Sequence, residues 1–250
     1  MEKLQVAGWI VGYRFSPEPG KHFGFNIFAL LDERERAALL IDTAYEEQAA
    51  AVRSELSSIG YTVIGTIISH FHPDHVMGLK ALPGVAIHGS VRFEETLRHY
   101  TDDEERRAFT PTDPVTDETR FEFGEHRLTF RLAPGHTPCT LYTFVGERFV
   151  HVADHIMTSN TGQDILPWAA FDLIPDHIDS LEMLRRFADR TFLLSHGVIL
   201  RGERQIHEAI DNRLAYFRAV LEGRGRISYE EAVRDCSCDF LHKEWLIQKG

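Results

Sequence analysis

The chain has 250 residues, of which 43% are hydrophobic and 26% charged, so it can bury a full core and is expected to form one main domain. Its net charge of −11 at pH 7 argues against a general nucleic-acid-binding protein, because phosphate binding requires a positively charged face. No apolar run approaches the roughly 18 residues that a membrane span requires, and there is no export signal, so we expect a cytoplasmic protein without a membrane partner.

The first part of the chain predicts several strands and one helix. Alternating or continuous apolar residues predict strands at residues 6–15, 23–31, 37–42 and 62–69. Between the third and fourth strands, residues 46–59 show an amphipathic pattern that ends at Gly60, which predicts a helix.

A cluster of metal-binding residue types follows directly after the strand that ends at Ser69. It reads His70-Phe71-His72-Pro73-Asp74-His75, or H-x-H-x-D-H. Alternate residues of an extended loop point the same way, so His70 and His72 can share one metal ion. Asp74 and His75 lie past the bend that Pro73 fixes and are free to face a second ion. The spacing therefore predicts a site for two metal ions.

The segment after this cluster is less regular. Its pattern predicts a short helix at 76–82, a strand at 85–88 and a helix at 91–100. The polar stretch 101–120 is expected to be a surface excursion, either a lid beside the site or an inert loop.

Three further candidate ligands stand at the ends of strand-like runs. His136 lies in the turn 134–138, Asp154 ends an apolar run that begins at Phe149, and His196 ends one that begins at Phe192. Folds of the α/β type place their chemistry at the carboxyl ends of strands. These positions therefore qualify as additional ligands.

The remainder of the chain predicts an irregular loop and then helices. The segment 158–176 contains Trp168 and Phe171, which are expected to line an apolar substrate pocket, with core packing as the ordinary alternative. Apolar residues at steps of three or four predict a helix over 205–221, and Ser228 is typical of the cap of a last short helix.

The order of these motifs resembles the metallo-β-lactamase superfamily: H-x-H-x-D-H, then a His in a G-H-T-P turn, then an Asp at a strand end, then a His before Gly. The resemblance covers most of the chain, through His196. It implies an α/β (α+β) fold of the αββα sandwich type, in which two mixed β-sheets pack face to face with helices on both outer faces. It further implies a metallo-hydrolase domain over residues 1–200, with a helical extension over 201–250 packed on the same domain.

The resemblance also implies a ligand set. Carried over position by position, it assigns His70, His72 and His136 to a first metal ion, Asp74, His75 and His196 to a second, and Asp154 to a bridge between them. Such ligands suit zinc, and manganese or iron can occupy them as well. Asp42, at the end of the strand 37–42, is expected to support the ligand loop by hydrogen bonding. His151, His155 and His177 occupy no motif position and are expected at the surface or behind the ligands.

These features predict a hydrolase with two divalent metal ions, Zn2+ as the first choice. A hydroxide between the metal ions would attack the substrate, and Asp74 would orient it and pass a proton to the leaving atom. The first choice of substrate is a small molecule with an ester-type bond, a thioester or a lactone. A homo-oligomer is compatible with the sequence.

Other functions stay open at this stage. A phosphodiesterase or ribonuclease of the same superfamily would share the ligands, although the acidic charge argues against nucleic acid. A persulfide dioxygenase with a single iron ion would differ in its metal content. A non-catalytic protein on the same scaffold would be expected to lose ligands, whereas this chain keeps every motif position. The three cysteines lack C-x-x-C spacing, which fits a reducing compartment.

Overall fold

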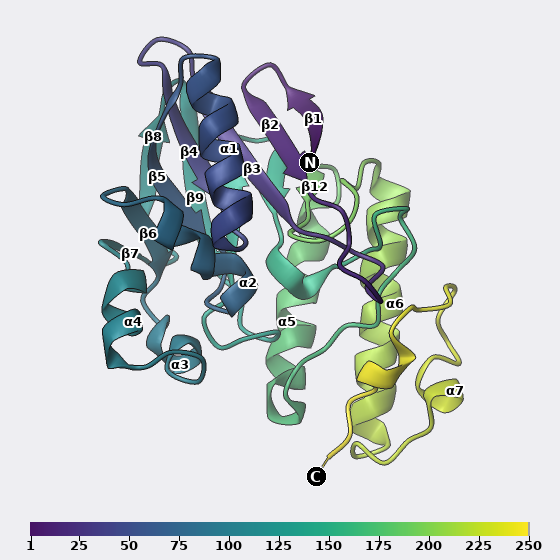
Figure 1. The fold of residues 1–250 in the computed structure, drawn as a ribbon. Helices are drawn as coiled ribbons and strands as arrows, with labels where there is room; N and C mark the ends of the chain where they lie inside the picture. Colours follow the sequence, from purple (N-terminus) through teal and green to yellow (C-terminus); the bar gives the residue numbers. More distant parts are fainter. Residues whose placement is uncertain (250) are drawn as a thin grey trace.

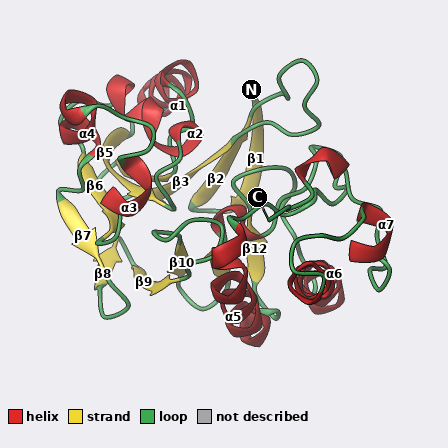
Figure 2. Ribbon diagram, turned by 90° about the horizontal axis from the view of Figure 1, so that it is seen from below, coloured by secondary structure: helices red, strands yellow, loops and turns green. Residues whose placement is uncertain are grey.

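Two β-sheets pack face to face, and helices cover both outer sides (Figures 1 and 2). The computed structural model describes residues 1–249. In Figure 2, α1, α2 and α4 lie on one side of the strands, and α5 and α6 lie on the opposite side. The predicted αββα sandwich is confirmed.

The first sheet has seven strands in sequence order. They are β1 (Glu2–Ala7), β2 (Ile10–Arg14), β3 (Asn26–Asp32), β4 (Ala37–Ile41), β5 (Thr62–Ile68), β6 (Ala86–Ser90) and β7 (Asp113–Val115). Neighbours from β1 to β4 are antiparallel, and those from β4 to β7 are parallel. The single strand predicted at 6–15 is wrong, because the chain turns back at Gly8 and Trp9 to form the hairpin of β1 and β2.

The second sheet has five strands in the order β12-β11-β10-β9-β8. They are β8 (Arg120–Phe123), β9 (His126–Leu132), β10 (Leu141–Val145), β11 (Phe149–His151) and β12 (Thr191–Leu193). Only the pair of β11 and β12 is parallel. Consequently, β4 and β5 of one sheet and β11 and β12 of the other are two parallel pairs, each with both carboxyl ends at one edge of its sheet.

The helices are α1 (Glu46–Ser58), α2 (Pro73–Val76), α3 (Glu94–Leu97), α4 (Asp103–Phe109), α5 (Ile174–Leu184), α6 (Glu203–Glu222) and α7 (Tyr229–Ala232). Short 3-10 turns are η1 (Met77–Ala81), η2 (Ala153–His155), η3 (Phe171–Leu173), η4 (Arg185–Phe187) and η5 (Lys243–Trp245). Within the described residues, none of the helices combines the length and apolar character that crossing a membrane would require.

Three buried layers hold the sandwich together. Between the sheets, Phe28 and Leu39 of the first pack in one cluster with Phe130 of the second. On the outer face of the first sheet, Val52 and neighbouring residues of α1 pack on the alternate strand residues. On the outer face of the second, α5 and α6 contribute a third cluster that includes Phe217. Because both faces of each central strand are buried, these strands read as continuous apolar runs.

Three elements were not visible in the sequence pattern. The stretch 101–120, expected to be a surface excursion, contains α4 and the edge strand β7. The helix α5 begins inside the segment expected to be irregular, and Pro175 lies in its first turn. Proline at the first turn of a helix is tolerated because the N–H that it lacks has no partner there.

Close backbone contacts fix the ligand loop after β5 against the turn after β4. The backbone N–H and the hydroxyl of Thr43 donate to the carbonyl of His75, at 3.1 and 2.8 Å. Gly78 lies so close to this turn that a Cβ there would stand 2.2 Å from the Thr43 oxygen and 2.8 Å from Cβ of Ala49. A glycine is therefore required where η1 meets the turn.

Gly78→Ala is expected to lower the free energy of unfolding by about 2 to 3 kcal/mol, because backbone atoms must move to admit the methyl group. Denaturant titration measures this loss. Gly8→Ala is the matched control, since a Cβ at Gly8 would meet nothing within 4 Å. Equal stability of the two variants would contradict the packing described for Gly78.

Candidate metal centre

The candidate ligands converge at one edge of the sandwich. The loop after β5 supplies His70, His72, Asp74 and His75, and the β9–β10 loop supplies His136. Asp154 follows β11 in η2, and His196 follows β12. The two parallel strand pairs thus deliver side chains from both sheets to one place, as the sequence predicts.

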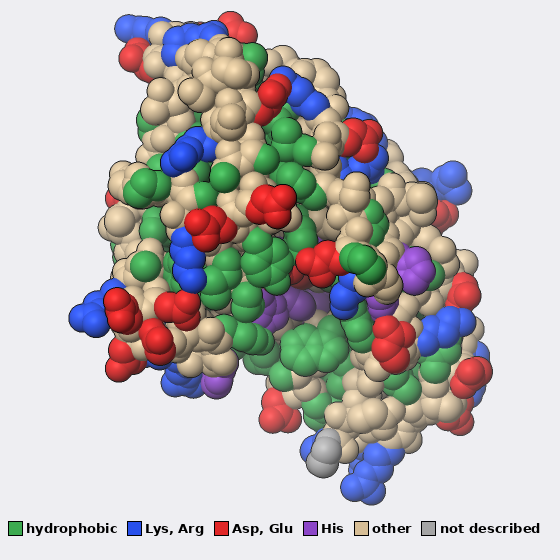
Figure 3. Space-filling model, viewed as in Figure 1, with side chains coloured by type: hydrophobic (Ala, Val, Ile, Leu, Met, Phe, Trp, Pro, Cys, Tyr) green, Lys and Arg blue, Asp and Glu red, His purple; other side chains and the backbone are tan. Residues whose placement is uncertain are grey.

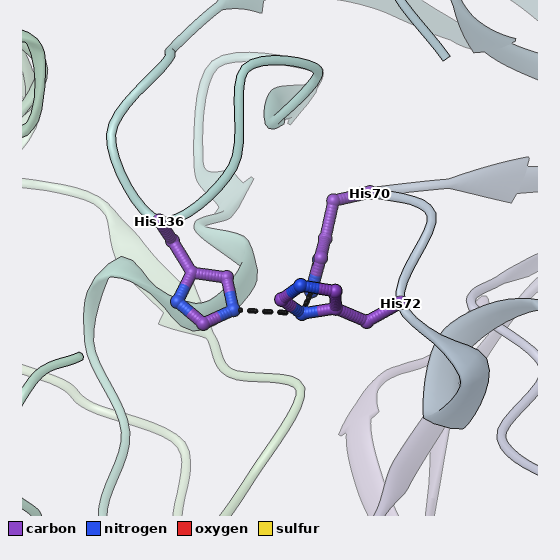
Figure 4. Close-up of side chains that lie close together, drawn as sticks. All are labelled: His70, His72 and His136. Atoms are coloured by element: carbon purple, nitrogen blue, oxygen red, sulfur yellow. Dashed lines mark hydrogen bonds between the residues drawn. The ribbon is translucent and has the colours of Figure 1, made fainter. Parts of the chain in front are cut away.

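Three histidines form a first group. The Nε2 of His70 lies 3.0 Å from Nδ1 of His72, and the Nε2 of His136 lies 3.1 Å from the same Nδ1 atom. Figure 4 shows the three rings pointing toward one another from two separate loops. Two nitrogen ligands of one tetrahedral zinc ion lie about 3.3 Å apart. The spacing of this group fits a shared cation.

Asp74, His75 and His196 form a second group. The Oδ2 of Asp74 lies 3.6 Å from Nε2 of His75 and 3.4 Å from Nε2 of His196. One ligand atom of each of the three lies within 4.8 Å of the others, which again suits a metal ion.

Asp154 lies between the two groups. Its Oδ2 is 3.8 Å from His70, 3.5 Å from His75, 3.5 Å from His136 and 3.4 Å from His196, measured to Nε2 of each ring. Its Oδ1 and the Nε2 atoms of His75 and His196 are buried and no hydrogen bond reaches them. Buried polar atoms are rarely left without a partner. The His and Asp clusters therefore fit a metal site, and the part played by each ligand stays a prediction.

Backbone carbonyls orient two of the imidazoles. Nδ1 of His136 lies 3.0 Å from the Trp168 carbonyl oxygen, and Nδ1 of His196 lies 2.9 Å from that of Gly24. Because only a protonated Nδ1 can donate to a carbonyl, these contacts leave Nε2 as the ring atom that can bind a metal ion. That atom faces the centre.

Asp42 lies behind the centre, where it joins three loops. It accepts hydrogen bonds from the backbone and hydroxyl of Ser69, both at 2.8 Å, and from the hydroxyl of Ser195 at 3.0 Å. Its Oδ2 is 2.8 Å from Nδ1 of His75. Burial alone would raise the pKa of this carboxyl, but His75 outweighs burial and holds the pKa below its usual value. Asp42 is therefore an ionised anchor for the His75 ring.

The two groups of ligands differ in protonation. In the first, burial lowers the pKa of His72 to about 3 and that of His70 well below its usual value, so both rings are neutral. In the second, burial alone would lower the pKa values, but nearby carboxylates, Asp154 foremost, outweigh it. They raise the pKa of His196 to about 10 and that of His75 well above its usual value.

Three further histidines are buried near the site, and the surface location considered for them is wrong. Nε2 of His151 lies 3.3 Å from the Ser195 hydroxyl, beside Asp42. The rings of His155 and His177 lie 4.0 Å apart. A Cβ on Gly135 would stand 2.5 Å from Cα of His177, so His177 backs the loop that carries His136. The only sequence signal for His151 was its place in an apolar strand.

A cavity of about 300 Å3 opens over the centre. It is lined by Phe23, His72, Asp74, His136, Asp154, Met157, Trp168, His196 and Trp245. Figure 3 shows histidines at the bottom of a hollow that hydrophobic side chains border. Trp168 lies in the wall of this cavity, and its contact with a substrate stays a prediction. Phe171 does not line this cavity, because its ring packs on the core under α5 and α6 and lies 5.1 Å from Nζ of Lys249.

Comparison with known proteins identifies the family. The model of the metallo-beta-lactamase superfamily matches residues 24–202, and the chain belongs to this family. No curated protein matches the chain. Members of the family that share the fold are metal-dependent hydrolases, and this membership together with the His and Asp clusters supports a metal-dependent hydrolase.

Solved structures share the fold at low sequence identity. A metallo-beta-lactamase from Pontibacter korlensis has a TM-score of 0.68 and 16% identity, over 87% of this chain and 98% of that one. A metallo-beta-lactamase family protein from Thermus thermophilus has a TM-score of 0.63 and 20% identity, over 87% and 82%. The DIM-1 metallo-beta-lactamase has a TM-score of 0.63 and 15% identity, over 84% and 96%.

Metal binding is expected to release protons from His75 and His196 at pH 7, because a cation that takes their Nε2 atoms must displace the protons that the carboxylates favour there. The apparent zinc affinity should therefore rise as the pH increases from 6 toward the His196 pKa of about 10. Calorimetric titration with zinc in buffers of different ionisation enthalpy counts the protons. A heat that does not depend on the buffer would contradict the raised pKa values of these two histidines.

Proposed function

We propose that the protein is a hydrolase that holds two divalent metal ions, zinc as the first choice, and cleaves an ester-type bond, a thioester or lactone, in a small molecule. The observation that carries this proposal is the position of Asp154. Its Oδ2 atom lies within 3.8 Å of four imidazole nitrogens, two from each group of ligands. A carboxylate so placed can bridge a pair of cations. In this proposal His70, His72 and His136 hold one ion, and Asp74, His75 and His196 hold the other.

Bound divalent ions in such a site supply a nucleophilic oxygen at neutral pH and polarise the carbonyl group of the substrate. The protein itself supplies orientation and a proton acceptor. The side chain of Asp74 is 26% exposed and lines the cavity, whereas that of Asp154 is 5% exposed. Asp74 is therefore the carboxylate that is more accessible to a substrate.

Asp74 is suited to proton transfer. Burial alone would raise its pKa, but the neighbouring His75 and His196 outweigh burial and hold the pKa below its usual value. The carboxylate is consequently ionised at neutral pH in the metal-free protein. In the proposed metal-loaded site its partly exposed side chain lines the cavity, where it can accept a proton from the attacking water. The same group can return that proton to the leaving oxygen or sulfur atom.

The cavity supports a neutral ester over a phosphodiester. Among the described residues that line it there is no lysine or arginine, and Phe23, Trp168 and Trp245 make much of the wall aromatic. A phosphodiester would bring negative charge to a site that already contains Asp74 and Asp154 and would need basic partners. The three cysteines are unpaired, which supports a reducing compartment such as the cytoplasm.

The first experiment is metal analysis of the purified protein together with a substrate panel of esters, thioesters, lactones, β-lactams and phosphodiesters. About two zinc ions per chain with ester, thioester or lactone cleavage is the expected result. One iron ion with persulfide oxidation would identify the dioxygenase alternative, and RNA cleavage that weakens with salt would identify the nuclease alternative.

His72→Ala and Asp154→Ala are each expected to reduce bound metal and to lower kcat/KM at least about a thousandfold, because each removes a ligand of the centre. Elemental analysis and the ester assay measure both effects on the same samples. His207→Ala is the matched control, since His207 lies on α6, where it pairs with Glu203. Full activity of Asp154→Ala would rule out a bridging role for this carboxylate.

A further inference from the structure

Two aromatic side chains from opposite ends of the chain meet at one wall of the cavity. The ring centroids of Phe23 and Trp245 lie 5.9 Å apart, and both residues line the cavity. The Phe23 ring is also 5.0 Å from the ring of His196, edge to face. Both Phe23 and Trp245 lie outside residues 24–202, the segment that matches the family model. This wall is therefore not specified by the family pattern.

Side-chain contacts hold Trp245 in place. The imidazole of His242 stacks on the indole, with ring centroids 4.5 Å apart and planes inclined by 21°. On one side of that imidazole, Nδ1 lies 2.8 Å from a carboxylate oxygen of Glu244, and on the other, Nε2 lies 3.4 Å from Nδ1 of His22. His22 directly precedes Phe23, so the same contacts tie both halves of the wall together.

Backbone hydrogen bonds also fix the segment that carries Trp245. The Leu241 N–H donates to the Asp164 carbonyl at 2.9 Å, and the Leu241 carbonyl accepts from the Leu166 N–H at 3.0 Å. Two residues beyond Trp245, the Ile247 N–H lies 3.1 Å from the Tyr216 hydroxyl of α6. Hydrogen bonds hold the segment on both sides of Trp245, so this wall of the cavity is preformed in the absence of a ligand.

The chemistry of this wall is apolar. Phe23 and Trp245 present ring faces and edges, and Met157 adds a thioether to the same lining. The lysine that lies over both rings is Lys21, whose Nζ lies 5.9 Å from the Phe23 centroid and 5.7 Å from the Trp245 centroid, and whose side chain is exposed. Cavities with an apolar wall beside a few convergent polar groups bind the hydrocarbon part of a ligand there.

We propose that Phe23 and Trp245 form a subsite for an apolar substituent of the substrate, an alkyl chain of about four to six carbons or a phenyl ring, held beside the bond that is cleaved. The placement next to the reacting bond rests on the proposed hydrolase function. The binding of the apolar group itself depends only on the wall.

The first test measures binding without hydrolysis. Calorimetric titration of the full-length protein with straight-chain carboxamides, from acetamide to octanamide, is expected to show Kd falling about threefold to fourfold for each added methylene up to hexanamide. Trp245→Ala and Phe23→Ala are each expected to reduce this dependence to less than about twofold for each methylene. Lys243→Ala is the matched control, because Lys243 pairs with Asp239 and lies over Tyr229.

The second test uses p-nitrophenyl esters of the same acyl series, with metal content and melting temperature measured on every variant. The expected result is a rise in kcat/KM with chain length that Trp245→Ala and Phe23→Ala flatten. If amide affinity rises with chain length but no ester, thioester or lactone is cleaved, the subsite is supported and the proposed hydrolase is contradicted. Two results would contradict the subsite but not the hydrolase. One is ester cleavage by the wild-type protein that does not depend on acyl chain length. The other is a dependence on chain length that is the same in both folded variants as in the wild-type protein.

Discussion

The architecture depends on the cost of placing five imidazoles and two carboxylates side by side, with all but His72 and Asp74 buried. Charged groups removed from water must be paired or bound to a cation. Here the carboxylates of Asp154 and Asp74 hold protons on His75 and His196, whereas the histidines of the first group are neutral. Even so, an oxygen of Asp154 and two imidazole nitrogens lack hydrogen bonds. A pair of cations would provide these atoms with partners that the protein itself does not supply.

The sandwich meets this requirement by bringing the ends of parallel strands from both sheets to one edge. Each end carries a supporting contact as well as a candidate ligand. Asp42, at the end of β4, connects the ligand loop to Ser195 at the end of β12, and backbone carbonyls orient His136 and His196. The side chains of the centre are therefore positioned by the same backbone that forms the two sheets. The segment around Trp245 extends this arrangement, because the last residues of the described chain return to the cavity and complete its wall.

The sequence was sufficient to predict the sandwich and the set of residues that meet at the centre. The H-x-H-x-D-H cluster and the strand-terminal acid and histidines lie in local patterns whose spacing has a direct chemical meaning. The orienting carbonyls of Gly24 and Trp168 could not be predicted, because every residue has a carbonyl and only the fold selects one. The role of Trp245 in the cavity wall could not be predicted either, since its contact with Phe23 joins positions at opposite ends of the chain. Phe171 was predicted to line the pocket and packs elsewhere, because an aromatic residue in a loop fits a core as well as a cavity.

The central claim is that these side chains hold a pair of metal ions on either side of Asp154. Anomalous X-ray diffraction at the zinc absorption edge, from crystals of the zinc-loaded protein, tests it most directly. Two peaks are expected, one among His70, His72 and His136 and the other among Asp74, His75 and His196, with a carboxylate oxygen of Asp154 in contact with both. A single peak, or peaks bound by other residues, would contradict it.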